Sequence, residues 1–186
     1  MDFIEATLQA VREYAGAHGL PPPSRRELGS GLSGVVYETP DPGTAVKVSP
    51  SMTGYEIIER QGHPGVVRVF HASEIPVDSA PLREYGFGFD GPIVNLLVMW
   101  IERLPFVGSE IWKPLGIPPR AAARIEQALE SVNGRSSKSM KRGLPILRRY
   151  HAFKALDQLL SEQAWSDMSL HNVGLSTTGW VVAFDW

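Results

Sequence analysis

The sequence predicts an α+β protein in which a β-rich half follows one helix and precedes a helical half. Three observations predict this class. Apolar residues near the N-terminus recur at helical spacing, the next stretch has short β-branched runs broken by glycine and proline, and helical patterns dominate beyond Val107. We therefore predict an N-terminal helix within residues 1–19, a β-rich domain over 20–103 and a helical domain over 104–186.

The N-terminal helix is expected over residues 2–18, because apolar side chains there lie on one narrow stripe. These side chains are Ile4, Leu8, Val11 and Ala15. Gly19 and Pro21–Pro23 are expected to end the helix and to form a stiff linker.

The β-rich half is expected to contain five strands. Residues 26–49 predict three of them, since the glycines within 29–34 and a turn over 39–43 interrupt the apolar runs. The remaining expected elements are a short helix over 53–61, strands over 66–70 and 93–101, and a loop over 78–90. The helical half predicts helices over 119–132 and 144–162, a polar loop over 133–143, and a final strand, turn and strand with Thr177–Gly179 as the turn.

Composition excludes several classes of protein. The chain has 186 residues, is 43% hydrophobic and 20% charged, and carries a net charge of −2. This is a globular composition, and the overall charge does not point to nucleic acid or anionic membrane as a partner. The absence of cysteine excludes disulfides, thiolate zinc sites and cysteine nucleophiles, and fits a reducing cytoplasm. The N-terminus lacks the pattern of a signal peptide, and the longest apolar run, Pro92–Ile101, is too short to span a bilayer.

A glycine-rich segment is the first candidate binding motif. Residues 29–36 fit the pattern G-x-G-x-x-G-x-V, in which glycines let backbone approach phosphate oxygens without a Cβ in the way. An ordinary hairpin turn is the alternative. A dinucleotide fingerprint is excluded, because Val35–Glu38 continues as a strand where that motif needs a helix. The residues of this segment expected to bind a phosphate-containing cofactor are Gly29, Ser30, Gly31, Leu32, Ser33, Gly34 and Val36.

Lys47 follows in an apolar strand, Thr44–Val48. Burying a lysine without a partner is costly, and a phosphate held by the glycine-rich segment would be such a partner. The alternative is an edge-strand lysine that points to water.

Three polar residues near the C-terminus, Asp167, Asn172 and Asp185, follow the glycine-rich segment and Lys47 at characteristic spacing. Asn172 lies five residues after Asp167, and Asp185 lies thirteen residues after Asn172. With the upstream motifs in the same order, the chain resembles the protein-kinase-like superfamily, which includes protein kinases and aminoglycoside and choline phosphotransferases. The resemblance covers about residues 27–186. It implies a bilobal fold with a β-rich ATP-binding lobe and a much reduced helical lobe, as in a minimal or truncated member, with ATP and Mg²⁺ as cofactors.

The resemblance also implies residue roles. Lys47 would bind the α- and β-phosphates and pair with a helix carboxylate, Glu56, with Glu59 as the second choice. Asp167 would align the acceptor hydroxyl and take its proton late, while Asn172 and Asp185 would bind magnesium. The residues expected around the adenine are Ala45 and Met99, which would face the nucleotide pocket, and Trp100, Ile101 and Glu102, which would contribute backbone.

The departures from the family pattern are specific. Trp165 and Ser166 stand where the family has His or Tyr and then Arg or Gly, and Ser169 replaces the family's Lys or His. The chain has no activation loop, so a phosphorylation-regulated switch is not expected. Phe184–Trp186 resembles the I-D-W of small-molecule phosphotransferases.

We therefore expect phosphoryl transfer to a hydroxyl, with a protein acceptor favoured, as in a serine/threonine kinase, because the glycine-rich segment and residues 56–67 resemble protein kinases. The alternatives are a small-molecule kinase and a nucleotide-binding regulator that acts by binding a partner protein. A partner surface is expected on the helix within 143–162, whose leucines would otherwise be exposed. A homodimer, another protein or the N-terminal helix folded back would cover the leucines at 144, 147, 156, 159 and 160.

Overall fold

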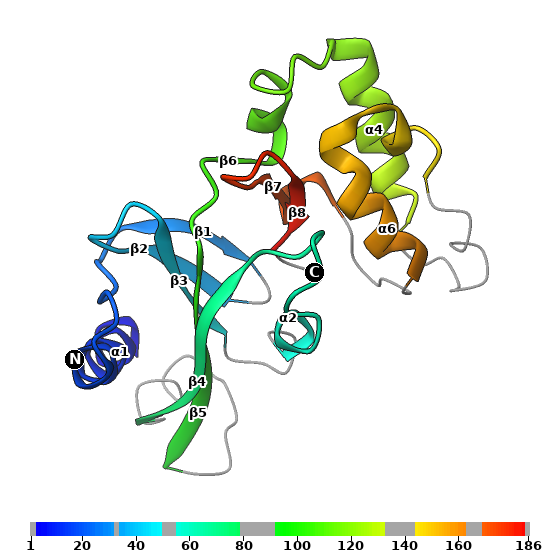
Figure 1. The fold of residues 1–186 in the computed structure, drawn as a ribbon. Helices are drawn as coiled ribbons and strands as arrows, with labels where there is room; N and C mark the ends of the chain where they lie inside the picture. Colours follow the sequence, from blue (N-terminus) through cyan, green and yellow to red (C-terminus); the bar gives the residue numbers. More distant parts are fainter. Residues whose placement is uncertain are drawn as a thin grey trace. The chain divides into compact units, whose positions relative to one another are not determined.

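The computed structural model of this chain describes residues 3–31, 34–49, 55–78, 92–132, 144–162 and 169–184. They form an α+β structure, as predicted, that divides into two compact units (Figure 1). The first unit comprises Met1–Ile58 and Val69–Arg103, and the second comprises Glu59–Arg68 and Leu104–Trp186. Residues 59–68 therefore belong to the second unit, although the sequence pattern placed them in the β-rich part.

The first unit contains a five-stranded antiparallel sheet in the order β1-β2-β3-β5-β4. The strands are β1 (Glu27–Gly31), β2 (Gly34–Glu38), β3 (Thr44–Ser49), β4 (Val69–Asp78) and β5 (Ile93–Glu102), and a short helix, α2 (Tyr55–Glu59), follows β3. The five predicted strands are present. The prediction of a strand over 66–70 is wrong in its bounds, because β4 begins at Val69 and continues through Pro76. A proline has no N–H to donate, and β4 tolerates it because it lies at the sheet edge.

The predicted turn between β2 and β3 is built around Asp41. Its Oδ1 accepts a hydrogen bond from the Gly43 N–H at 3.0 Å, and its Oδ2 accepts one from the Thr44 hydroxyl at 2.6 Å. The hydrogen bonds from Thr44 and then from Gly43 lower the pKa of the Asp41 carboxyl. This turn fixes where β3 begins and therefore which residues of β3 face each side of the sheet.

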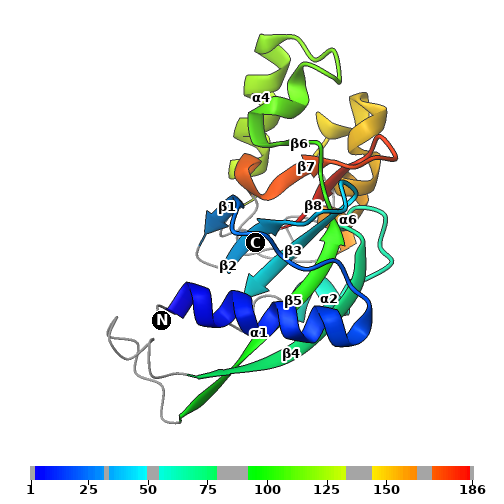
Figure 2. The same ribbon diagram turned by 90° about the vertical axis from the view of Figure 1, so that its left-hand side faces the viewer.

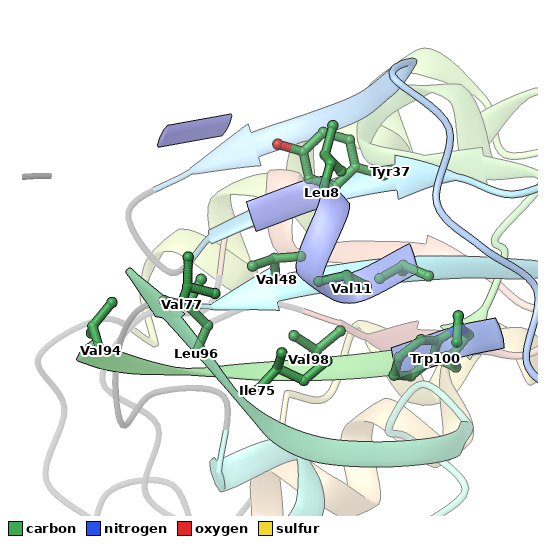
Figure 3. Packing of buried hydrophobic residues seen from close by; sticks show 12 residues of the cluster. Leu8, Val11, Tyr37, Val48, Ile75, Val77, Val94, Leu96, Val98 and Trp100 are labelled. Carbon is green, nitrogen blue, oxygen red and sulfur yellow. The ribbon is translucent and has the colours of Figure 1, made fainter. Parts of the chain in front are cut away.

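Helix α1 (Phe3–His18) packs on one face of this sheet (Figure 2). It ends at Gly19, whose φ of +66° suits a residue without a Cβ, and the Leu20 N–H caps the helix by donating to the Ala15 carbonyl at 2.9 Å. Figure 3 shows the side chains of Leu8 and Val11 among buried residues of the strands. The strand residues of this cluster include Tyr37, Val46, Val48, Ile75, Leu96, Val98 and Trp100.

Polar contacts hold α1 and the proline linker in place. The Trp100 indole N–H donates to the Pro21 carbonyl at 2.9 Å, and the Arg12 Nε–H donates to the Pro23 carbonyl at 3.0 Å. The Tyr14 hydroxyl lies 3.0 Å from Nε2 of His71 on β4. Three residues of the predicted apolar stripe, Leu8, Val11 and Ala15, are thus buried within the first unit, whereas Ile4 is exposed. The suggestion that this helix covers part of residues 143–162 is therefore not supported.

The second unit combines a small sheet with helices. Its strands lie in the order β6-β7-β8. Its elements are β6 (Phe106–Val107), η2 (Gly108–Trp112), α4 (Pro119–Glu130), η3 (Leu147–Arg149), η4 (His151–Phe153), α6 (Lys154–Glu162), η5 (Leu170–Asn172), β7 (Val173–Leu175) and β8 (Val181–Ala183). The predicted turn between the last two strands is present, with Gly179 at a φ of +85°.

The single helix predicted over 144–162 is wrong. Tyr150 has an extended backbone, with φ −121° and ψ 119°, and it separates the short helical turns η3 and η4 that precede α6. This break lets the segment fold compactly, and its leucines at 144, 147, 156, 159 and 160 are all buried. The exposed apolar face that motivated a homodimer or partner contact is therefore not present, and the partner itself stays a prediction without that support.

Segment 59–68 packs tightly within the second unit. The Ala183 N–H donates to the Gly65 carbonyl and the Val67 N–H donates to the Ala183 carbonyl, each at 2.8 Å. A Cβ on Gly65 would lie 2.5 Å from the carbonyl oxygen of Ala155, so this close approach to α6 requires glycine. Strand β8 is thus held by β7 and also by residues 65–67. Among the described residues, no helix combines the length and apolar character needed to cross a lipid bilayer.

Packing of α1 on the sheet predicts unequal effects of two truncations in the same helix. Leu8 is 1% exposed and Ile4 is 57% exposed. We expect Leu8→Ala to lower the free energy of unfolding by about 2–5 kcal/mol, because it leaves a cavity in the core. Ile4→Ala is the matched control and is expected to change it by less than about 0.5 kcal/mol. Urea unfolding followed by circular dichroism measures both, and equal effects would contradict this packing.

Candidate active site

The predicted site residues of the first unit form a row across the sheet. Lys47 on β3 is paired with Val36 on β2 and with Met99 on β5. Directly paired residues of antiparallel strands point to the same face, and successive residues alternate. Their chain neighbours Tyr37, Val46 and Trp100 pack beneath α1. The row of Val36, Lys47 and Met99 therefore lies on the opposite face of the sheet, which α1 does not cover.

Lys47 is deeply buried on that face. Its side chain is 1% exposed, and Met99 beside it is 0% exposed. Ala45 and Ile101 form the next cross-strand pair on the same face, and both are buried. The alternative in which Lys47 points to water from an edge strand is wrong, because β3 lies inside the sheet. A buried ammonium needs an anion or several acceptors to offset its desolvation, so this position is chemically demanding.

The glycine-rich segment forms the hairpin of β1 and β2. Gly29 pairs with Val36, Ser30 pairs with Val35, and Gly31 pairs with Gly34. Leu32 and Ser33, at the predicted tip of the phosphate loop, lie outside the described residues.

Packing within the protein explains why a glycine is needed at one position of this hairpin, Gly34, but not at another, Gly29. Gly34 has a φ of +138°, and a Cβ there would overlap the carbonyl oxygen of Val48, so the close packing of β2 on β3 requires glycine. Among the described residues, no atom lies within 4 Å of where a Cβ on Gly29 would be. Protein packing therefore does not explain Gly29, and the open space beside it is what a ligand that approaches the backbone would need.

The acidic partners proposed for Lys47 lie on α2. The side chain of Glu56 lies outside what the structure describes. Glu59 is exposed, and it forms no ion pair with another residue of the described ranges. A buried ammonium gains little from a solvated carboxylate, so Glu59 is a weak candidate partner, and Glu56 stays a prediction.

The backbone expected to bind the adenine edge lies partly inside the sheet. Trp100 is paired with Val46 on one side and with His71 on the other, and Ile101 also has partners on β3 and β4. Backbone polar groups of a strand between two others are directed to those strands. The expectation for Trp100 and Ile101 is therefore not supported, whereas Glu102, at the end of β5, has a strand partner only on β3.

In the second unit, the β7–β8 hairpin brings together the two segments predicted to bind metal. The Phe184 N–H donates to the carbonyl of Asn172 at 3.0 Å. Asp185 follows Phe184 directly in the chain. Asp185 itself and Asp167 lie outside the described residues.

The donor set predicted for the metal fits magnesium. An amide oxygen from Asn172 and a carboxylate from Asp185 are hard oxygen ligands, and Mg²⁺ in proteins typically uses one or two of these with phosphate oxygens and water. Within the described ranges, no three His, Cys, Asp or Glu side chains gather as a preformed metal site. Magnesium at this hairpin would therefore depend on Asp185 and on phosphate oxygens.

Sequence reasoning assigns no role to Asp157, yet this carboxylate is buried in α6. Its Oδ1 accepts the Leu144 N–H at 2.7 Å, and its Oδ2 accepts the Arg148 Nε–H at 2.8 Å. The sequence signal for this residue is an aspartate among the leucines of a helix. A buried carboxylate at such a position needs hydrogen-bond donors, which here are the Leu144 N–H and Arg148.

No protein-family model matches this chain, and no curated protein matches its sequence. The resemblance to kinase-like enzymes therefore depends on the motifs of this chain, on their order and on their spacing.

The contrast between the two glycines predicts opposite effects of the same substitution. We expect Gly34→Ala to lower the free energy of unfolding by at least about 1–3 kcal/mol, because alanine is strained at this φ. Gly29→Ala is the matched control in the same hairpin and should leave stability unchanged or raise it by about 0.4–1 kcal/mol. Guanidinium unfolding of both variants checks this, and a destabilised Gly29→Ala with a tolerated Gly34→Ala would show that the hairpin packs differently.

Proposed function

We propose that this chain is an ATP- and magnesium-dependent phosphotransferase that acts on a hydroxyl, as a minimal serine/threonine protein kinase. The observation that carries the proposal is the burial of Lys47 in the sheet, in one row with Val36 and Met99. The hairpin that supplies Val36 also contains Gly29, for which protein packing gives no reason. A lysine beside a glycine-rich hairpin is an arrangement that binds nucleotide phosphates.

In this proposal, each residue has a limited task. Lys47 and the backbone N–H groups of the glycine-rich hairpin bind and orient the phosphates. Asn172 and Asp185 hold magnesium, which when bound neutralises charge on the phosphate oxygens. The support from the second unit is the Phe184–Asn172 hydrogen bond, which ties together the segments that carry both ligands.

Asp167 orients the acceptor hydroxyl. As the hydroxyl oxygen forms its bond to the γ-phosphorus, the bond from that phosphorus to the bridging oxygen breaks, ADP leaves, and Asp167 accepts the hydroxyl proton. Such a transition state needs mainly positioning and electrostatic stabilisation, so few side chains suffice. A protein acceptor is favoured by the protein-kinase-like glycine motif of residues 29–36.

Two substitutions separate phosphate binding from acceptor activation. Lys47→Met keeps an unbranched chain in the buried position, so we expect an intact fold and phosphoryl transfer reduced by at least about a hundredfold. Asp167→Ala is expected to abolish transfer and to leave nucleotide affinity within a few-fold, because Asp167 acts on the acceptor. Transfer of radiolabel from ATP to the chain or to added protein, together with calorimetric nucleotide titrations, measures both effects.

Lys113→Met is the matched control, since Lys113 is an exposed lysine outside the proposed site. Equal turnover by Lys47→Met and the wild-type chain would remove Lys47 from the site. Magnesium-dependent nucleotide binding without transfer to any acceptor would instead favour a nucleotide-binding regulator.

A further inference from the structure

An open cavity of about 640 Å³ lies in the second unit, and none of the residues that line it belongs to the proposed phosphotransfer site. Arg148, Arg149 and His151 come from the short turns η3 and η4. Lys154 and Ser161 come from α6, two helical turns apart, and Asp157 lies between them, one turn from each on the same face. The volume lies within the range of small-ligand pockets and exceeds what a single phosphate ion fills.

The charges of this cavity are unbalanced. Its one carboxylate, Asp157, is buried and already accepts hydrogen bonds from Arg148 and from the Leu144 N–H. Arg149 and Lys154 are exposed, and no carboxylate in the described part of the chain forms an ion pair with either. The cavity thus has a surplus of two positive charges on a chain whose net charge is −2.

The donors of the cavity suit one class of ligand. A guanidinium group recognises a phosphoryl group through two parallel N–H bonds, and an ammonium group adds a point charge. Asp157 binds Nε of Arg148, which fixes the plane of that guanidinium at the cavity wall. His151 adds a further hydrogen-bonding group, whereas the Ser161 hydroxyl already donates to the Gln158 carbonyl at 2.8 Å.

We propose that this cavity binds a phosphate monoester. Arg149 and Lys154 supply the charge that attracts the phosphoryl group, and Asp157 is a positioning residue that orients Arg148. The volume leaves room for the group that carries the phosphate, such as a phosphoserine in a polypeptide. This cavity shares no residue with the proposed phosphotransfer site, and the proposal does not depend on that site.

The experiment is a titration of the full chain followed by backbone amide NMR shifts at constant ionic strength, with no nucleotide present. The two probes are inorganic phosphate and a phosphoserine peptide, with the unphosphorylated peptide as the blank. The test variant is Arg149→Gln/Lys154→Gln. The control is Arg120→Gln/Arg124→Gln, which removes the same charge from exposed positions on α4.

Saturable shifts at residues 147–154 are expected with the wild-type chain. Affinity should fall by at least about tenfold in the test variant, since two charged hydrogen-bond donors are lost, and by less than about twofold in the control. Tighter binding of the phosphopeptide assigns the source to a protein, and equal binding of both probes assigns recognition to the phosphoryl group alone. Unsaturable shifts, or equal losses in both double variants, would overturn the proposal. Because the readout is binding, this result is independent of phosphotransfer activity.

Discussion

Burial of the Lys47 ammonium is the constraint on which the first unit depends. Removing this charge from water is costly, and the fold does so in an interior strand with Val36 and Met99 on either side. Helix α1 covers the other face, so the sheet has one face devoted to core packing and one face that carries the lysine. The close approach of β2 to β3, which requires Gly34, holds the glycine-rich hairpin beside that face. Lys47 is thus both a buried residue of the sheet and the residue proposed to bind the nucleotide phosphates.

The second unit depends on β8. Backbone hydrogen bonds tie Ala183 to Gly65 and Val67, while β7 pairs along its other side. Gly65 in turn fits closely against Ala155 of α6. These contacts fix the end of β8 and, through the Phe184–Asn172 hydrogen bond, the start of β7. The segments with the predicted metal ligands therefore come from a well-supported hairpin, although it is built from two strands of three residues each.

Local patterns predicted the α+β class, the first helix, the five strands and the final hairpin, because each depends on spacing within a short window. They failed where distant contacts decide. Strand β4 can include Pro76 because it lies at the edge of the sheet. Residues 65–67 do not belong to β4, because Gly65 and Val67 form hydrogen bonds with Ala183 of β8 instead. The extended backbone of Tyr150 lets the leucines around it bury themselves within their own unit. For the candidate site, an apolar strand predicted the burial of Lys47. The pairing of Trp100 with strands on both sides could not be predicted, since register depends on the whole sheet.

The proposed role of Lys47 can be tested by labelling with an acyl-phosphate derivative of ATP, because this reagent acylates a lysine that lies beside bound nucleotide phosphates. Mass spectrometry then identifies the modified lysines. Our account predicts that Lys47, despite its burial in the free protein, is labelled and that excess ATP protects it. An exposed lysine outside both proposed sites, Lys113, should be labelled weakly and without protection. Labelling confined to the exposed lysines and unaffected by ATP would contradict the account.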